Sequence, residues 1–464
     1  MGGTKTGAVA LSVLPLGPAQ RIRRRIDGVS LLTCYLVVLL AIPSRLSFAP
    51  LGGAGSPAVV VGLMGFGTWS YFHVMRNRPW GQGRQPVRTA LFCLLFCFAI
   101  SYVGAMNRAI DPDESSSAQL SMVVLLSWCG AMVLANDGIP DRARFETLLR
   151  RVVYGAGALA ALGLIQFVTG RTWVDMVSIP GLTANQALST LTSREGFHRP
   201  AGTAIHPIEF GAVLTMALPI AVNLAIADKS RDFVLRWAPP LVIAMSIVVS
   251  ISRSAVICAV VGLLLLVPSW TRSMRWGALA CSIGFVGFVY VMIPGLIETI
   301  VRLFTGIGQD SSAASRVDSY ALAGEFIARS PIYGRGFGTF LPKYRILDNQ
   351  YLGLLIEVGA LGLIAMLSLV ITAMVCSRLV VGTTSDERVK LTGQAMFASV
   401  AAGGVGLAFY DGLGFPMAAG FLFLVLGIAG AQWRIARREP GFSDPRARSL
   451  RASRRRRHAT STDA

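Results

Sequence analysis

Arginines at the edges of apolar segments are the first residues in this chain that suggest chemistry. Arg199 comes just before an apolar run at about 204–226, and Arg253 lies in the turn between two further runs, flanked by serines. Three more fall in a long polar stretch at about 296–347: Arg316, Arg335 and Arg345. Guanidinium groups match phosphate oxygens bidentately, so this set favours a phosphate or diphosphate ligand. The alternative for Arg253 is an arginine that merely snorkels its charge toward water.

Carboxylates near the same segments could accept a proton. Asp348 begins another apolar run, at about 348–377, and Asn349 follows it directly. Glu209 stands three residues after His206, so the two side chains share a helix face. An Asp at a helix start either caps the helix or serves as a general base, because capping occupies its oxygens. We take Arg253, Asp348 and Glu209 as candidate catalytic residues, and Arg199, His206, Arg316, Arg335, Arg345 and Asn349 as candidate substrate ligands.

Metal and nucleotide chemistry are not indicated by the sequence. The seven cysteines all fall in apolar segments, and no Cys/His set has the spacing of a zinc site. The glycines at 334, 336 and 338 are not preceded by a strand pattern, so a turn is favoured over a nucleotide loop. We expect no disulfide, no metal and no cofactor.

The composition fixes the class of protein that must position these residues. The 464 residues are 53% hydrophobic and only 14% charged, whereas a soluble domain has about 25% charged residues. This excludes a water-soluble enzyme and a disordered chain, and apolar runs of this length exclude a porin-type barrel. The sequence predicts an all-α polytopic integral membrane protein.

Twelve apolar runs are long enough to be candidate spans. Their approximate limits are 29–49, 57–75, 88–106, 118–135, 147–169, 204–226, 233–251, 253–268, 276–295, 348–377, 391–410 and 412–433. Two pairs of runs need tight turns, at Ser250–Ser254 and at Asp411–Gly414. The segment after Arg21–Arg25 could instead be a signal peptide, but it lacks a clean small-residue cleavage site, so a first transmembrane helix is favoured.

The net charge of +19 is distributed as a topology signal. With the N-terminus in the cytoplasm, the interior loops and tail collect 31 of the 43 Lys and Arg residues, and the exterior loops collect 12. This is the positive-inside pattern, so no nucleic-acid partner is needed to explain the charge. The chain is expected to have a basic N-terminus at 1–28, a membrane domain at 29–433 and a tail at 434–464, with both termini cytoplasmic.

Two regions outside the spans are distinctive. The exterior loop at 296–347, between predicted helices 9 and 10, is too long for a simple connector and has a helical pattern at about Ser315–Arg329. The tail carries Arg454–Arg457 and is predicted to be disordered. It could contact anionic lipid headgroups or serve as a docking site for a cytoplasmic partner.

Two stretches of the sequence resemble the O-antigen ligase and O-antigen polymerase superfamily of membrane glycosyltransferases. The first runs from Arg199 through His206 to Gly211. The second runs from Ser315-Arg316 through Ser330-Pro331 and the glycine cluster to Asp348-Asn349, with Gly359 and Gly362 beyond. The turn around Arg253 also fits. The resemblance covers about 199–365 and depends on the order and spacing of these features together.

The resemblance implies a fold of about twelve helices and a metal-independent transfer of glycan from an undecaprenyl-diphosphate carrier. It assigns the carrier's diphosphate to Arg199, Arg253 and Arg316. The ligases of the family have a His at the position of Asp348. Either Asp348 replaces that His as the base, or the chain is not a ligase. The departure favours polymerisation of an exopolysaccharide or cell-wall glycan.

The expected setting is the bacterial cytoplasmic membrane, with a lipid-linked glycan donor, a glycan or lipid-glycan acceptor and membrane lipids as partners. A chain-length regulator is a further candidate partner. A transporter or flippase of lipid-linked oligosaccharide is the main rival, since twelve spans and intramembrane charges also suit that class. No repeat relates the two halves of the chain, and the polar residues gather on one side. A membrane scaffold without catalysis would leave the arginines unexplained.

Overall fold

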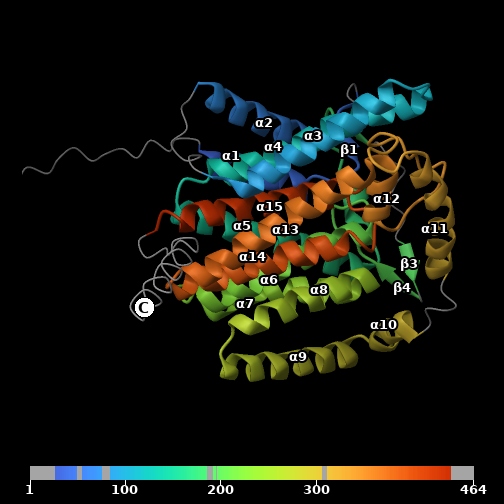
Figure 1. Ribbon diagram of the computed structural model, residues 1–464. Helices are drawn as coiled ribbons and strands as arrows, with labels where there is room; N and C mark the ends of the chain where they lie inside the picture. Colours follow the sequence, from blue (N-terminus) through green and yellow to red (C-terminus); the bar gives the residue numbers. More distant parts are fainter. Residues whose placement is uncertain are drawn as a thin grey trace, which may run out of the picture.

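A computed structural model describes residues 27–49, 55–75, 84–184, 192–194, 196–305 and 311–439. These residues form fifteen α-helices (Figure 1). The helices are α1 Gly28–Ala41, α2 Pro57–Val74, α3 Pro86–Met106, α4 Pro112–Gly138, α5 Arg142–Thr169, α6 Pro207–Ala227, α7 Phe233–Val249, α8 Arg253–Leu266, α9 Arg272–Met292, α10 Leu296–Thr305, α11 Ser311–Arg329, α12 Gln350–Glu357, α13 Gly359–Thr383, α14 Glu387–Gly406 and α15 Pro416–Ala436. Short strands are β1 Leu46–Ser47, β2 Thr183–Ala184, β3 Thr192–Arg194 and β4 Phe197–Arg199, with 3-10 turns η2 Trp173–Met176 and η3 Val267–Ser269.

The all-α polytopic fold predicted from the sequence is confirmed. Eleven of the twelve predicted apolar runs each overlap one helix, and the twelfth overlaps two. Seven of the described helices are long and apolar enough to cross a membrane, and three shorter ones are apolar. The run at 348–377 is wrong as a single helix: it divides at Val358 into α12 and α13, where Gly359 has φ +67°.

The core of the bundle is built around α15. Of the 18 most apolar consecutive residues of α15, 94% are buried, because α4, α13, α14 and α6 all pack on this helix. In the corresponding 18 residues of α9, only 6% are buried. Figure 1 shows α9 apart from the main bundle, next to α10. A helix that is apolar on all sides and open on most of them is suited to a lipid environment.

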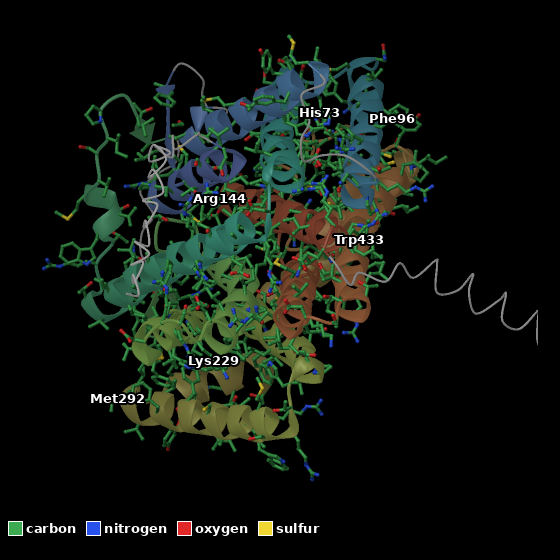
Figure 2. The ribbon with its side chains drawn as sticks, turned by 90° about the vertical axis from the view of Figure 1, so that its left-hand side faces the viewer. His73, Phe96, Arg144, Lys229, Met292 and Trp433 are labelled. Atoms are coloured by element: carbon green, nitrogen blue, oxygen red, sulfur yellow. The ribbon has the colours of Figure 1, made fainter. Side chains whose placement is uncertain are left out.

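One end of the bundle holds most of the arginines of the short connections; we name it the basic end. It lies at the left of Figure 1 and faces the viewer in Figure 2, which labels Arg144 and Lys229 there. Ion pairs join its connections: Arg144 to Asp27 at 2.6 Å and Arg150 to Asp228 at 3.1 Å. That this end faces the cytoplasm stays a prediction of the positive-inside pattern.

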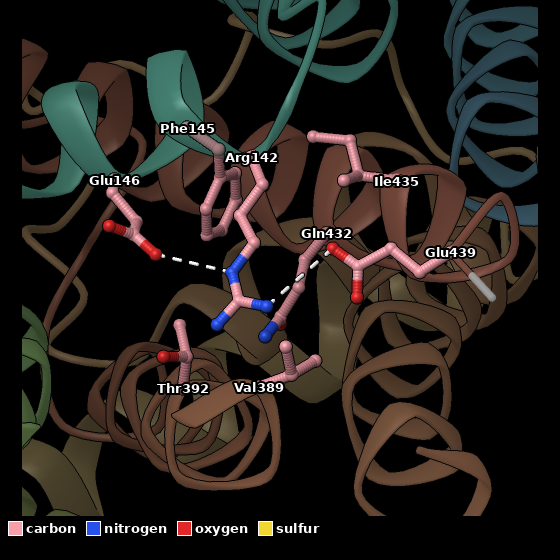
Figure 3. Close-up of a pocket in the computed structure, with 8 residues that line it drawn as sticks. All are labelled: Arg142, Phe145, Glu146, Val389, Thr392, Gln432, Ile435 and Glu439. Carbon is pink, nitrogen blue, oxygen red and sulfur yellow. Dashed lines mark hydrogen bonds and ion pairs between the residues drawn. The ribbon is translucent and has the colours of Figure 1, made fainter. Parts of the chain in front are cut away.

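A small cavity at the basic end is closed by one of these ion-pair networks. Figure 3 shows Arg142 of α5 between Glu146, at 3.2 Å, and Glu439, at 3.9 Å. Arg142 also pairs with Asp386, the N-cap of α14, at 2.6 Å. The cavity volume is about 30 Å³, which is room for a water molecule. Its contacts link α5, α14 and the end of α15, so we assign it a structural role.

The opposite end carries two long connections, one between α5 and α6 and one between α9 and α12; we name it the loop end. It lies at the right of Figure 1 and holds α10, α11, α12 and the two antiparallel strand pairs, β1 with β2 and β3 with β4. The predicted loop helix at about 315–329 is present as α11, which ends at Arg329. Residues 1–26 and 440–464, which include Arg21–Arg25 and Arg454–Arg457, lie outside the described residues.

Candidate functional site

The turn between α7 and α8 is the centre of the candidate site. The predicted tight turn is present: α7 ends at Val249 and α8 begins at Arg253, with Ser252 as its N-cap. Ile251 in this turn is fully buried and has φ +48°. A positive φ is rare for a β-branched residue and costs about 1–3 kcal/mol, so the surrounding structure must impose it. Strain of this kind is characteristic of functional sites.

Arg199 and Arg253 lie on the two sides of this turn. Arg199, at the end of β4, is buried and donates from Nε to the carbonyl of Ser250 at 2.9 Å. Arg253 is half-buried and donates from Nη1 to the carbonyl of Leu303 in α10 at 3.1 Å. The structure therefore places two arginines, which the sequence separates by a whole helical hairpin, on the same turn.

His206 is held next to Arg199 in a defined protonation state. It is the N-cap of α6, and its Nδ1 accepts the backbone N–H of Ile208 at 3.1 Å, which places the ring proton on Nε2. Burial, with the charge of Arg199, lowers the pKa of His206 to about 4. The imidazole is thus neutral at physiological pH. It can donate a hydrogen bond from Nε2 but is unsuited to act as the base.

Glu209 joins the start of α6 to the start of α15. Its carboxylate is fully buried and accepts backbone N–H groups from Ile205 at 2.8 Å, Met417 at 2.6 Å and Ala418 at 3.4 Å. These donors occupy both oxygens. The geometry favours a positioning role for Glu209 over the role of proton acceptor suggested by its place in the sequence.

We expect Glu209→Ala to destabilise the folded protein by about 3–5 kcal/mol, because it strands buried N–H donors that cost about 1–3 kcal/mol each. Glu209→Gln keeps one acceptor oxygen and should lose less. Thermal unfolding in detergent measures both. If Glu209→Ala were as stable as the parent but inactive, Glu209 would act on the substrate and not on the fold.

The loop between α14 and α15 reaches the start of α12. The backbone N–H of Gln350 donates to the carbonyl of Leu407 at 2.8 Å, and its side-chain oxygen accepts the N–H of Leu413 at 2.6 Å. Asn349 caps α12 by accepting the N–H groups of Tyr351 and Leu352. The cap is therefore Asn349 and not Asp348, which leaves the general-base alternative for Asp348.

Asp411 in this loop is a titratable neighbour of Asp348. Loss of hydration in this turn raises the pKa of the Asp411 carboxyl to about 6. The backbone N–H of Gly414 opposes the rise, and the negative charge of Asp348 adds to it. Of the two carboxyl groups, Asp411 is therefore the one that takes up a proton near pH 6.

Aromatic side chains connect this loop to His206. The rings of His206 and Phe415 are stacked with centroids 6.0 Å apart, and those of Tyr410 and Phe415 are 6.1 Å apart. Tyr410 is buried, and this raises the pKa of its hydroxyl well above the usual range. The loop thus lies against the α6 N-terminus, with Asp411 next to Tyr410.

Arg335 has a defined set of protein partners. It forms an ion pair with the buried Glu114 of α4, and its guanidinium lies 4.9 Å from the ring centre of Phe326 and 5.1 Å from that of Tyr344. Tyr344 donates to the same Glu114. These contacts fasten the long loop to α4. A substrate role for Arg335 stays a prediction.

The glycine cluster is a turn, as predicted from the absence of a preceding strand. Gly334 has φ +71°, and a Cβ there would meet the backbone of Glu357 at 2.3 Å. Arg345 is half-buried and lies in the chain between this turn and α12. Arg316 lies on α11, and its side chain is outside the described part of the structure.

Part of this region matches a known protein family. Residues 240–367 match the family model described as O-Antigen ligase. The match covers just over a quarter of the chain, and we call residues 240–367 the ligase-like segment. This segment contains the α7–α8 turn with Arg253 and the whole long loop through Asp348 and Asn349. The match supports the superfamily resemblance seen in the sequence. No curated protein matches the chain.

Several residues of the site lie outside the ligase-like segment. Arg199, His206 and Glu209 precede it, and Asp411 follows it. In the sequence, Asp411 stands out only as part of the predicted tight turn at Asp411–Gly414. The signal that could have singled it out was the one used for Arg253: a charged side chain in a short exterior connection between two apolar runs.

Proposed function

We propose that this protein transfers glycan from an undecaprenyl-diphosphate-linked donor to a hydroxyl group of a glycan acceptor. The similarity of residues 240–367 to the O-antigen ligase family supports membrane glycan transfer of the ligase or polymerase kind. The observation that carries the finer proposal is the position of Arg199 and Arg253 on one strained turn at the loop end, together with two neighbouring carboxylates, Asp411 between α14 and α15 and Asp348 before α12.

Arg199 and Arg253 bind the diphosphate in this proposal. As the bond to the sugar breaks, negative charge grows on the diphosphate, and preorganised guanidinium donors stabilise that charge most where little water competes. His206 contributes a neutral N–H donor to the same oxygens. Arg316 and Arg345, from the long loop, are proposed as further donors to the carrier or its glycan. The two arginines supply the charge that a metal ion supplies in other transferases, so the reaction needs no metal.

The carboxylate pair accepts the proton of the acceptor. The acceptor oxygen attacks the anomeric carbon, a new C–O bond forms, and the bond from that carbon to the diphosphate oxygen breaks with its electron pair on the diphosphate. The acceptor proton passes to the carboxylate of Asp411 or Asp348. A group with a pKa near 6 is deprotonated at neutral pH yet basic enough to take this proton.

The loop end is proposed to face the exterior, where lipid-linked glycan units are assembled into longer chains. The His-to-Asp difference at 348 favours polymerisation of an exopolysaccharide or cell-wall glycan over ligation to lipopolysaccharide. The acceptor is then a second glycan on its own lipid.

A deletion strain tests the proposal. Undecaprenyl-diphosphate-linked units should accumulate on the exterior face and be consumed on complementation with the parent gene, but not with Arg253→Ala. Accumulation on the cytoplasmic face would make the protein a flippase. No accumulation at all would favour a scaffold.

Topology is tested separately by single-cysteine labelling in a background without the seven native cysteines. Positions 330–345 should react with a membrane-impermeant maleimide from outside intact cells, and positions 140–144 only after lysis. The reverse pattern would place the loop end in the cytoplasm and exclude an exterior reaction.

A further inference from the structure

A second, larger cavity lies along one side of the bundle. It has a volume of about 910 Å³ and is lined by α3, α13 and the end of α15. That volume is in the range of ligand pockets, about 300–1,000 Å³. On α13 the lining extends from Leu361 to Leu379, a rise of about 27 Å at 1.5 Å per residue. The cavity is therefore a crevice nearly as long as the hydrocarbon core of a bilayer is thick, about 30 Å.

The walls of this crevice suit a hydrocarbon chain. They are mostly apolar, and four apolar wall residues of α13 are exposed: Leu361, Ile364, Ile371 and Val375. The crevice is therefore open to the outside of the bundle along this side. The facing side of α3 is formed by small side chains, Ala90, Cys93 and Cys97, which leave the space open. Helix pairs in a bilayer normally close such space by packing, so a crevice of this size calls for an occupant.

The crevice ends in cations at the basic end. Arg84, just before α3, and Arg437, just after α15, both line it and are both exposed. Among the residues that the structure describes, neither forms an ion pair with an acid; Arg437 lies 5.6 Å from the ring centre of Trp433. Figure 2 labels Trp433 at the basic end.

The charge around these two arginines is in excess. Arg88, Arg434 and Arg438 lie close by, since the charges of Arg88 and Arg438 both act on Arg434. Two acids lie in this region, and both are already used. Asp137 binds Arg88 at 2.5 Å and the indole N–H of Trp69 at 2.8 Å, and Glu439 pairs with Arg142 at 3.9 Å. An anion at Arg84 and Arg437 would offset this excess.

We propose that the crevice binds an anionic phospholipid, with its acyl chain along α3 and α13 and its phosphate between Arg84 and Arg437. Basic pockets between helices at the cytoplasmic surface are suited to anionic headgroups. A carrier lipid with its diphosphate at Arg253 would have its headgroup at the other end of the bundle, and Arg84 and Arg437 would have no role. The inference does not depend on the proposed glycan transfer.

Native mass spectrometry of the whole protein in detergent tests the site, with phosphatidylglycerol and phosphatidylcholine as probes. Phosphatidylglycerol should remain bound at lower concentration than phosphatidylcholine. The double variant Arg84→Gln/Arg437→Gln should weaken phosphatidylglycerol binding about 30-fold, because each basic residue near a headgroup contributes about fivefold. Ser368→Trp, which fills the crevice without changing charge, should weaken it as well.

The matched control is Arg272→Gln/Arg275→Gln, which removes two exposed arginines at the start of α9, outside the crevice. It should leave binding unchanged. Equal retention of the two lipids, or an equal loss in the control and the crevice variants, would overturn the proposal. Displacement of phosphatidylglycerol by undecaprenyl phosphate, unaffected by the arginine changes, would also overturn it and make the occupant the carrier chain.

Discussion

Replacing Arg253 by Lys is expected to lower the rate of glycan transfer about 100-fold while the protein stays folded, since one preorganised donor to a developing oxyanion is worth about 10²–10³ in rate. Lysine keeps the charge but lacks the planar fork of donors, so it cannot bind Leu303 and the diphosphate in the same geometry. The measurement is release of undecaprenyl diphosphate from a lipid-linked donor by the purified protein in nanodiscs, with kcat and KM determined separately.

The control for Arg253→Lys is Arg272→Lys, the same exchange on the exposed start of α9. It should leave kcat and KM unchanged. Melting temperatures and gel-filtration profiles show whether each variant is folded. A larger fall in kcat than in 1/KM would place the lost contact in the transition state. Near-parental activity of Arg253→Lys would remove Arg253 from the site.

The spans and the turn around Arg253 were predictable because they depend on local signals. Apolar runs of about twenty residues indicate membrane helices whatever the rest of the chain does. The break at Val358 was not predictable in this way. A Cβ at Gly359 would lie 2.4 Å from the backbone of Ile332, so the break is imposed by a loop that packs there only in the folded protein.

Only some residues of the candidate site could be predicted from the sequence, and their partners could not. Arg199 and Arg253 could be chosen by residue type and position, because an arginine at a span edge needs a reason. The partners of Glu209 and Arg335 could not: Met417 is 208 positions from Glu209, and Glu114 is 221 positions from Arg335. Asp348 and Asp411 are brought near each other by the bridge from Gln350 to Leu413, across 63 positions. Such pairings depend on how helices far apart in the chain pack, which no periodicity encodes.

Asp411→Asn is expected to lower transfer about 1,000-fold at pH 7, because a positioned general base contributes about 10²–10⁴ in rate. In the parent protein the rate should rise with pH and reach half its maximum near pH 6, since the raised pKa of Asp411 keeps its carboxyl protonated, and so inactive, below that pH. The rate should be flat from pH 7 to 8. A pH profile of kcat measured with donor in excess reports this titration.

Asp348→Asn separates the two members of the pair. It removes the negative charge that helps to raise the pKa of Asp411, so the rise in rate should move to lower pH while most of the activity at pH 7 is kept. Asp113→Asn, the same exchange in an exposed residue of α4 at the loop end, serves as the control and should leave the profile in place. The opposite result, in which Asp348→Asn abolishes transfer and Asp411→Asn merely shifts the profile, would make Asp348 the base. Retention of activity by both variants would mean that the acceptor proton leaves by another route, and the carboxylate pair would then be a feature of the fold alone.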